Sequence, residues 1–262
     1  MHGVAATAAA GSCAAFLEHG FELRAHLADF LSLDPAELDR QLPLATAELA
    51  SNHPGALLPH QAEAFYEQEV GDGHLFDLAA WHLNSADYIG TTLKLQAQMA
   101  HGQHLDFGGG IGSHALAAAL LPQVDQVWMV DLNGRHRDFV SFRAERLNVA
   151  HKLRCVRDLG APELPSCFQS LVCLDVLEHL PDPAAQLRIF AERMDPSSGV
   201  ALFNWYFFKG FAGEYPFHFD DAEMVDEFFA TLQALYLECF HPHLITARTY
   251  RLRGSAAKLR KG

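Results

Sequence analysis

The sequence has few basic residues for its length. Its 262 residues include 19 Lys and Arg against 32 Asp and Glu, a formal net charge of −13 with histidine neutral. A surface that negative repels phosphate backbones and anionic lipids, so nucleic acid is not expected as a substrate. The one basic cluster lies near the C-terminus and is interpreted as a solvated tail. It contains Arg251, Arg253, Lys258, Arg260 and Lys261.

Long apolar runs and paired cysteines are also missing. No apolar stretch is long enough to span a membrane, and residues 1–11 lack the basic leader and long apolar core of a signal peptide. We therefore expect a cytoplasmic protein. The five cysteines are odd in number and form no CxxC pair, which predicts reduced thiols, no disulfide framework and no metal site. Half of the residues are hydrophobic, as in an ordinary globular chain.

The spacing of apolar residues along the chain changes near residue 100. The first part has apolar residues at helical spacing and a typical helix start at Asp34-Pro35. Further helical stretches are expected at 45–51, 61–70, 74–83 and 86–100. The sequence therefore predicts an N-terminal helical part over residues 1–100 and a second domain over residues 101–262.

Short apolar runs alternate with helical patterns in the second part. This alternation predicts an α/β fold, with a doubly wound, mostly parallel sheet and helices on both faces. The expected strands are 104–107, 126–131, 153–156, 170–175, 200–206, 237–240 and 246–252. The expected helices are 113–121, 135–149, 183–194 and 221–235.

A glycine-rich turn follows the first predicted strand, from Asp106 to Gly112. A turn between a strand and a helix brings a ligand close to backbone N–H groups. The spacing is D-x-G-x-G-x-G, with Ser113 where the dinucleotide fingerprint G-x-G-x-x-G would need another glycine. Asp106 would repel a pyrophosphate but attract an ammonium group. S-adenosylmethionine carries an ammonium and a sulfonium and no phosphate, so it is the expected ligand.

Further acidic residues end the neighbouring strands. Asp131 follows the apolar run 127–130, where a carboxylate can accept hydrogen bonds from ribose hydroxyls. Asp158-Leu159 follows the third strand. The segment from Leu174 to Pro183 follows the fourth. The carboxyl ends of parallel strands meet at one edge, so these residues are expected to form one site.

These residues resemble the class I S-adenosylmethionine-dependent methyltransferases. The motifs Leu-Asp-Phe-Gly-Gly-Gly-Ile-Gly and Val-Leu-Glu-His-Leu-Pro-Asp-Pro look like the small-molecule branch that includes ubiquinone-biosynthesis methyltransferases. The resemblance implies a Rossmann-like domain with seven strands, the last of them antiparallel. It further implies that the N-terminal helical part caps the site as a lid and shapes substrate choice. It also implies a set of cofactor-binding residues. These are Asp106, Gly108, Gly110 and Gly112 around the methionine end, Asp131 on the ribose, Leu132, Asp158 and Leu159 around the adenine, and Asp175 by the sulfonium.

Methyl transfer from a sulfonium is an in-line displacement, which depends mostly on positioning. A base helps when the acceptor is a hydroxyl or ammonium group, and the candidates are His179, His218 and Tyr66. Positioning without a base remains an equal alternative. The expected substrate-binding residues are Tyr66, Tyr88, Glu178, Asn204 and Trp205. Trp81 is assigned to the core instead.

Other functions stay open at this point. The same fold can use S-adenosylmethionine without methyl transfer, for instance by cyclising its aminobutyryl chain and releasing 5′-methylthioadenosine. A non-catalytic protein that binds the cofactor is a further alternative. A NAD-linked oxidoreductase is disfavoured by the glycine spacing. The expected partner is a small molecule whose acceptor atom is O, N or C, and the protein is expected to be a monomer or homodimer.

Overall fold

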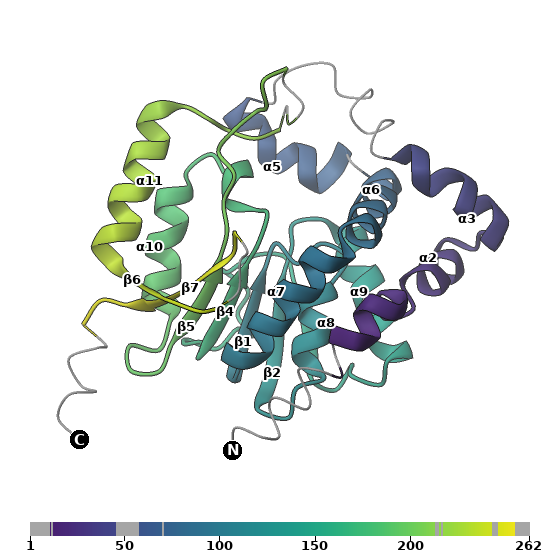
Figure 1. Cartoon of the computed structure of the whole chain (residues 1–262), viewed down its shortest axis with the longest axis horizontal. Helices are drawn as coiled ribbons and strands as arrows, with labels where there is room; N and C mark the ends of the chain where they lie inside the picture. Colours follow the sequence, from purple (N-terminus) through teal and green to yellow (C-terminus); the bar gives the residue numbers. More distant parts are fainter. Residues whose placement is uncertain are drawn as a thin grey trace.

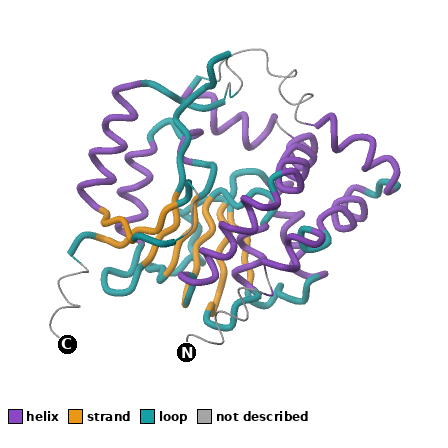
Figure 2. Tube along the Cα trace, in the orientation of Figure 1, coloured by secondary structure: helices purple, strands orange, loops and turns teal. Residues whose placement is uncertain are grey.

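A seven-stranded sheet forms the centre of the molecule (Figure 1, Figure 2). In spatial order its strands are β3, β2, β1, β4, β5, β7 and β6, and β7 is antiparallel to both of its neighbours. The strands are β1 (Gly102–Phe107), β2 (Val124–Val130), β3 (Leu153–Val156), β4 (Ser170–Cys173), β5 (Val200–Phe203), β6 (Tyr236–Cys239) and β7 (Arg248–Leu252). The predicted α/β fold with an antiparallel last strand is confirmed.

The computed structural model describes residues 11, 13–45, 58–69, 71–212, 215, 217–242 and 246–254. Most of the helix expected at 45–51, and three residues of the basic C-terminal cluster, lie outside these ranges. Within these ranges, every helix is too short or too polar to cross a membrane.

Two helical layers cover the sheet (Figure 1). One face carries α7 (Ala86–Met99), α8 (Ser113–Ala119) and α9 (Gly134–Arg146), whose apolar residues form one core cluster with the strands. The other face carries α10 (Pro183–Arg193) and α11 (Ala222–Leu235), which pack on a second cluster. Asp182 caps α10 by accepting a hydrogen bond from the N–H of Ala185, and Asp221 caps α11 in the same way.

The first part of the chain is helical, as predicted. The described elements are α2 (Leu23–Leu31), α3 (Pro35–Gln41), η1 (Leu42–Leu44), η2 (Pro59–Gln61), α5 (Ala62–Ala64), η3 (Phe65–Glu69) and α6 (Gly71–Asn84). Asp34 caps α3 through the N–H of Ala36. The stretch expected as one helix at 61–70 is divided, because η3 is a turn of π-helix.

A fully buried arginine ties this helical part to the sheet. The Arg143 guanidinium in α9 donates to the carbonyl oxygens of Gly20 and Phe21 at 2.8 and 3.2 Å. It also donates to the carbonyl of Ile111 in the glycine turn at 2.7 Å. One side chain thus joins the N-terminal segment and the glycine turn.

Strands β4 and β5 end earlier than the sequence predicts. The expected strands reach Asp175 and Tyr206, whereas the observed ones end at Cys173 and Phe203. The side chain of Asn204 explains the difference, because its Oδ1 accepts a hydrogen bond from the N–H of Asp175 at 2.6 Å. A side-chain amide replaces the next backbone pair, so the two strands separate and open the edge of the sheet.

Candidate active site

The glycine turn lies at the carboxyl end of β1, between β2 and β4. Gly108 and Gly110 have φ of 72° and 53°, a region that disfavours other residues. A Cβ on Gly108 would also lie 2.3 Å from Cγ2 of Val176. Gly112 immediately precedes α8. The turn therefore needs glycine both for its conformation and for its contact with the segment after β4.

Asp106 lies beneath this turn with a carboxylate oxygen unused. Its side chain is buried, and Oδ2 has no hydrogen-bond partner among the described residues. Burial, followed by the nearby Asp131, raises the pKa of Asp106 to about 7, against a hydrogen bond from the Ala115 backbone. A buried acceptor without a donor fits an ammonium group, which would supply both the missing hydrogen bond and the missing charge.

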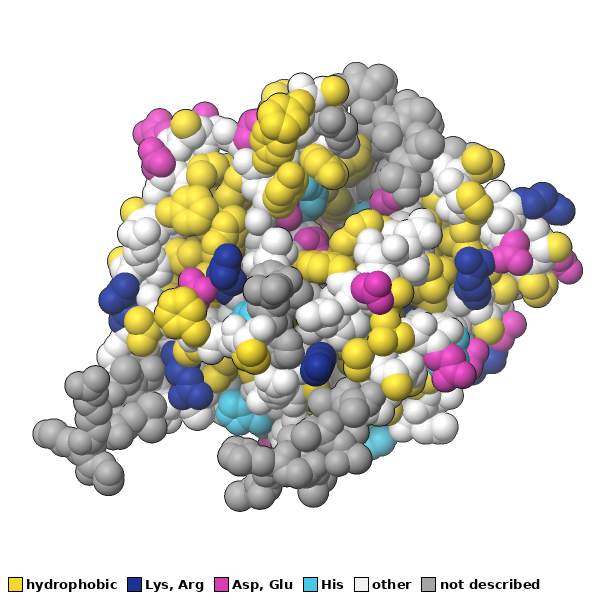
Figure 3. All heavy atoms as spheres, in the orientation of Figure 1, with side chains coloured by type: hydrophobic (Ala, Val, Ile, Leu, Met, Phe, Trp, Pro, Cys, Tyr) yellow, Lys and Arg dark blue, Asp and Glu magenta, His cyan; other side chains and the backbone are white. Residues whose placement is uncertain are grey.

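A pocket opens above Asp106 and the glycine turn. Figure 3 shows the surface hollowed in this region, with acidic and histidine side chains at its floor. Asp175 also lines the pocket, as do Trp81 and His82 of α6. Trp81 packs against the core cluster that contains Phe16 and Phe21, as expected, and it lines the pocket as well. His82 was not anticipated, and it is held by a 2.9 Å hydrogen bond between its Nδ1 and the Ser113 hydroxyl.

Asp131 follows β2 and supports the glycine turn directly. Its Oδ2 accepts from the N–H of Gly110 at 2.9 Å, and its Oδ1 accepts from the N–H of Asn133 at 2.9 Å and lies 3.1 Å from Nδ1 of His136. Burial acts to raise the pKa of Asp131, but His136 and the two backbone donors hold it below its usual value. The carboxylate is thus ionised beside the turn, and ribose binding by it stays a prediction.

The residues expected around adenine lie on two neighbouring loops. Leu132 is half-buried, and its carbonyl accepts a 2.8 Å hydrogen bond from Arg137. Asp158 forms an ion pair with the adjacent Arg157 and accepts from the N–H of Gly160. Leu159 packs against the core beneath α10. Their contacts with adenine stay predictions.

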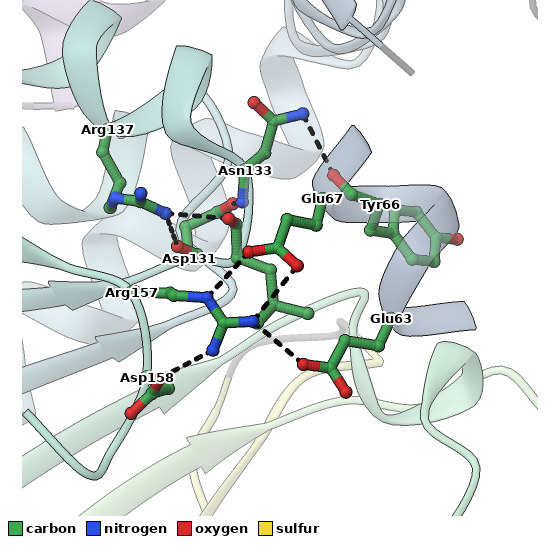
Figure 4. Close-up of polar contacts among 9 residues, drawn as sticks. Glu63, Tyr66, Glu67, Asp131, Asn133, Arg137, Arg157 and Asp158 are labelled. Carbon is green, nitrogen blue, oxygen red and sulfur yellow. Dashed lines mark hydrogen bonds and ion pairs between the residues drawn. The ribbon is translucent and has the colours of Figure 1, made fainter. Parts of the chain in front are cut away.

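Arg157 was not anticipated as a site residue. Its guanidinium binds Glu63 and Glu67 of the N-terminal segment at 3.0 and 2.7 Å, in addition to Asp158 at 2.8 Å (Figure 4). The side chain of Asn133 also donates to the carbonyl of Tyr66. These bonds hold α5 and η3 over the loops that follow β2 and β3. We call residues 59–69 the cover segment.

Three predicted residues, of which Asp175 lines the pocket, are joined by hydrogen bonds. The Asn204 amide donates to the Tyr88 hydroxyl at 2.8 Å and to Oδ1 of Asp175 at 2.6 Å. Asp175 has a φ of 55°, which is rare for a residue with a side chain. Burial raises the pKa of Asp175 to about 6, against the hydrogen bond from Asn204. These hydrogen bonds fix the orientation of Asp175 at the pocket wall.

A second group lies just beyond Asp175. The hydroxyl of Tyr66 is 3.1 Å from Nδ1 of His179, and the rings of His179 and His218 are 4.8 Å apart. Burial, followed by the nearby His218, lowers the pKa of His179 to about 4. Burial likewise raises the pKa of Glu178 to about 8. The structure thus brings together four of the residues proposed for catalysis and substrate binding.

Trp205 lies away from this group. Its ring packs against Phe228 and Phe229 of α11, at centroid distances of 5.4 and 5.7 Å. The early end of β5 turns it into the core beneath α11. The structure does not bring it to the pocket, contrary to the expectation for a substrate-binding residue.

The sheet order, the glycine turn and the unsatisfied Asp106 together define an S-adenosylmethionine site of the methyltransferase type. The model of a methyltransferase domain family matches residues 80–251, and the chain belongs to this family. The predicted family, fold and cofactor are thereby confirmed.

Two bacterial relatives resemble about half of the chain. The ubiquinone biosynthesis O-methyltransferase of Xanthomonas euvesicatoria is 30% identical over 133 residues, covering 50% of this chain and 53% of that protein. The Chromobacterium violaceum protein of the same name is 31% identical over 115 residues, covering 43% and 46%. The chain thus spans about half the length of these relatives. Among solved structures, YcgJ of Bacillus subtilis has a TM-score of 0.45 and 20% identity, covering 59% of this chain and 70% of that one.

Proposed function

We propose that the protein transfers the methyl group of S-adenosylmethionine to a hydroxyl group of a small molecule. The observation that carries the proposal is the pairing of two features along one pocket edge. Asp106 offers an unpartnered carboxylate oxygen beneath the glycine turn, and Tyr66, Glu178, His179 and His218 gather beyond Asp175. A hydroxyl acceptor is further supported by the relatives, both named as O-methyltransferases.

The cofactor, when bound, supplies an electrophilic methyl group and a neutral thioether leaving group. Asp106 would hold its ammonium group, while the glycine turn supported by Asp131 would line the methionine end. Asp175, fixed by Asn204, would limit movement at the reacting end. The acceptor would approach from the side of Tyr66 and His179, whose polar groups can orient its hydroxyl. Positioning of the acceptor oxygen in line with the methyl group then supplies most of the rate acceleration.

We also propose that the first hundred residues close the site and select the acceptor. The cover segment supplies Tyr66 to the catalytic side, and Arg157 holds the same segment over the expected adenosine side. A separate acceptor pocket for a large substrate would need this segment to move.

The test is product analysis with the purified protein, labelled S-adenosylmethionine and a panel of phenols, catechols, amines and carbon acids. We expect S-adenosylhomocysteine and a methyl ether. Release of 5′-methylthioadenosine, or transfer to amines alone, would overturn the proposal. Asp106→Asn should remove most activity, whereas Asp125→Asn changes an exposed aspartate near the start of β2 and serves as the matched control.

A further inference from the structure

Three side chains around the acceptor side converge in a way that hydrogen bonding alone does not explain. Glu178 and His179 belong to η4 (Leu177–His179), directly after β4, and His218 comes from the loop after β5. One potential ligand atom from each of the three lies within 4.8 Å of the others. A hydrogen bond from the N–H of Phe219 to the carbonyl of Glu178, at 2.8 Å, joins the two segments. The convergence is therefore built into the backbone.

Both imidazole rings are oriented by backbone carbonyls. Nδ1 of His179 lies 3.1 Å from the carbonyl oxygen of Phe217, and Nδ1 of His218 lies 3.1 Å from that of Phe208. Nδ1 of His179 also lies 3.1 Å from the Tyr66 hydroxyl, and His218 has a second backbone hydrogen bond, to Tyr206. An Nδ1–H that donates to the Phe217 or Phe208 carbonyl would leave Nε2 as the basic nitrogen. This arrangement is the usual support for a histidine that binds a metal. The ring of Tyr215 also stacks on His218, at 5.1 Å and 11°.

Glu178 is the acidic member of these three side chains. Its side chain is 1% exposed, and Oε2 has no hydrogen-bond partner among the described residues. A buried carboxylate oxygen without a donor is costly unless a cation or a proton occupies it. Two oriented imidazoles beside it make a cation the better match.

We propose that Glu178, His179 and His218 bind one divalent cation of the zinc type. Two imidazoles and one carboxylate are a typical donor set of catalytic zinc, which keeps a fourth position open. Imidazole ligands favour zinc over magnesium or calcium. At Zn–N and Zn–O distances of about 2.0–2.2 Å the ligand atoms must approach one another more closely than the 4.8 Å within which they lie here, so binding requires the side chains to rotate.

The role of the cation rests on the proposed function. An acceptor hydroxyl bound at the open position would lose its proton to solvent more readily, because the cation stabilises the oxyanion. The oxygen would then form its bond to the methyl carbon as the carbon–sulfur bond breaks. His179 and His218 would act as ligands and not as bases.

Cobalt(II) is the probe, because zinc has no visible spectrum. Full-length protein, treated with a chelator and desalted, is titrated with Co²⁺ while visible absorption is recorded. We expect one equivalent to bind, with displacement by Zn²⁺. His218→Ala and Glu178→Gln should each weaken Co²⁺ binding at least about tenfold. His151→Ala, which removes an exposed histidine, should bind as the wild type does. Equal binding by all four proteins, or no saturable binding, would overturn the proposal.

A second measurement needs no variant. In the wild type with Co²⁺ bound, proton NMR should show two exchangeable, strongly shifted signals from the Nδ1–H groups of the ligand histidines. Fewer than two such signals would overturn the proposed ligand set. S-adenosylhomocysteine affinity, measured by calorimetry, reports whether each variant is folded.

The metal proposal and the proposed function can fail separately. Methyl transfer that is unaffected by a chelator would overturn the metal proposal and leave the proposed function intact. Stoichiometric Co²⁺ binding without transfer to any hydroxyl would support the metal site and overturn hydroxyl methylation.

Discussion

Asp106 is a carboxyl group whose ionisation should depend on the cofactor. Its pKa of about 7 reflects burial without a donor, and an ammonium group would lower it. Below pH 7 the carboxyl is mostly protonated before binding and ionised afterwards. Cofactor binding should therefore release a proton, and affinity should fall about tenfold for each pH unit below 7.

Calorimetry at pH 6 in buffers of different ionisation enthalpy measures this release. We expect nearly one proton per S-adenosylmethionine in the wild type and in Asp125→Asn. Asp106→Asn should release none and bind about 10- to 100-fold more weakly, the range for losing a charged hydrogen bond. Proton release that persists in Asp106→Asn would show that another group carries the effect.

Gly108 should be the least replaceable residue of the glycine turn. An alanine there combines a positive φ with a close contact to Val176, and the strained φ alone costs about 1–3 kcal/mol. Gly108→Ala should lower the melting temperature and abolish S-adenosylhomocysteine binding. Gly134→Ala is the matched control, because a Cβ there meets only a side-chain nitrogen of Arg137 at 3.6 Å. Similar behaviour of the two variants would contradict the packing argument.

His104 should contribute to the acid sensitivity of the fold. It is fully buried in β1 between Ser170 and Gln96, and burial, followed by His114 and His101, lowers its pKa to about 3. The unfolded chain takes up this proton near pH 6.5, whereas the folded protein does not. The stability that His104 provides is therefore complete above pH 6.5 and is lost as the pH falls toward 3.

Urea unfolding of the wild type and His104→Asn tests this. At pH 7.5 the variant should be less stable by about 1–2 kcal/mol, because a buried hydrogen bond is lost. At pH 5 the difference should shrink by about 2 kcal/mol, since the variant has no proton to gain at this position. A difference that is independent of pH would contradict the proposed cause.

At the scale of elements, the cover segment is held by ion pairs at the molecular surface. Arg157 binds Glu63 and Glu67, and such exposed pairs contribute little to global stability. These ion pairs instead keep the cover segment in place over the loops that follow β2 and β3. We therefore expect Arg157→Gln to affect ligand exchange much more than folding.

Stopped-flow fluorescence of Trp81, which lines the pocket, can follow S-adenosylhomocysteine dissociation. Arg157→Gln should speed dissociation by about 2- to 10-fold with little change in melting temperature. Arg188→Gln breaks an equally exposed ion pair with Glu227, far from the pocket, and should leave the rate unchanged. Equal rates in the wild type and Arg157→Gln would show that the ion pairs do not hold the segment.

At the scale of the whole molecule, the sequence is informative where the signal is local. The strands around Asp106 and Asp131 follow from short apolar runs, and the cofactor side follows from their ends. The end of β5 does not, because it depends on a bond between Asn204 and Asp175, 29 residues apart. Arg157 was missed for the same reason, since its partner Glu67 is 90 residues away.

The proposed metal site shows most clearly what the sequence alone does not predict. Zinc motifs are recognisable when ligands recur at short spacing, and the cysteines show no such pattern. Here His218 comes from another loop than Glu178 and His179, so only the fold brings the three together. The sequence identified all three residues as site candidates and assigned them other roles.

Arg143 makes the helical part and the sheet inseparable as building blocks. Removing the segment with Gly20 and Phe21 would leave a buried guanidinium with one carbonyl acceptor, which costs more than the helix contacts alone. A version that lacks this segment should therefore be less stable, because the guanidinium stays buried with fewer acceptors. Arg143→Met, with an apolar side chain of similar length, should recover part of the melting temperature that a version without residues 1–22 loses. The buried charge of α9 thus depends on carbonyl groups 122 and 123 residues earlier in the sequence.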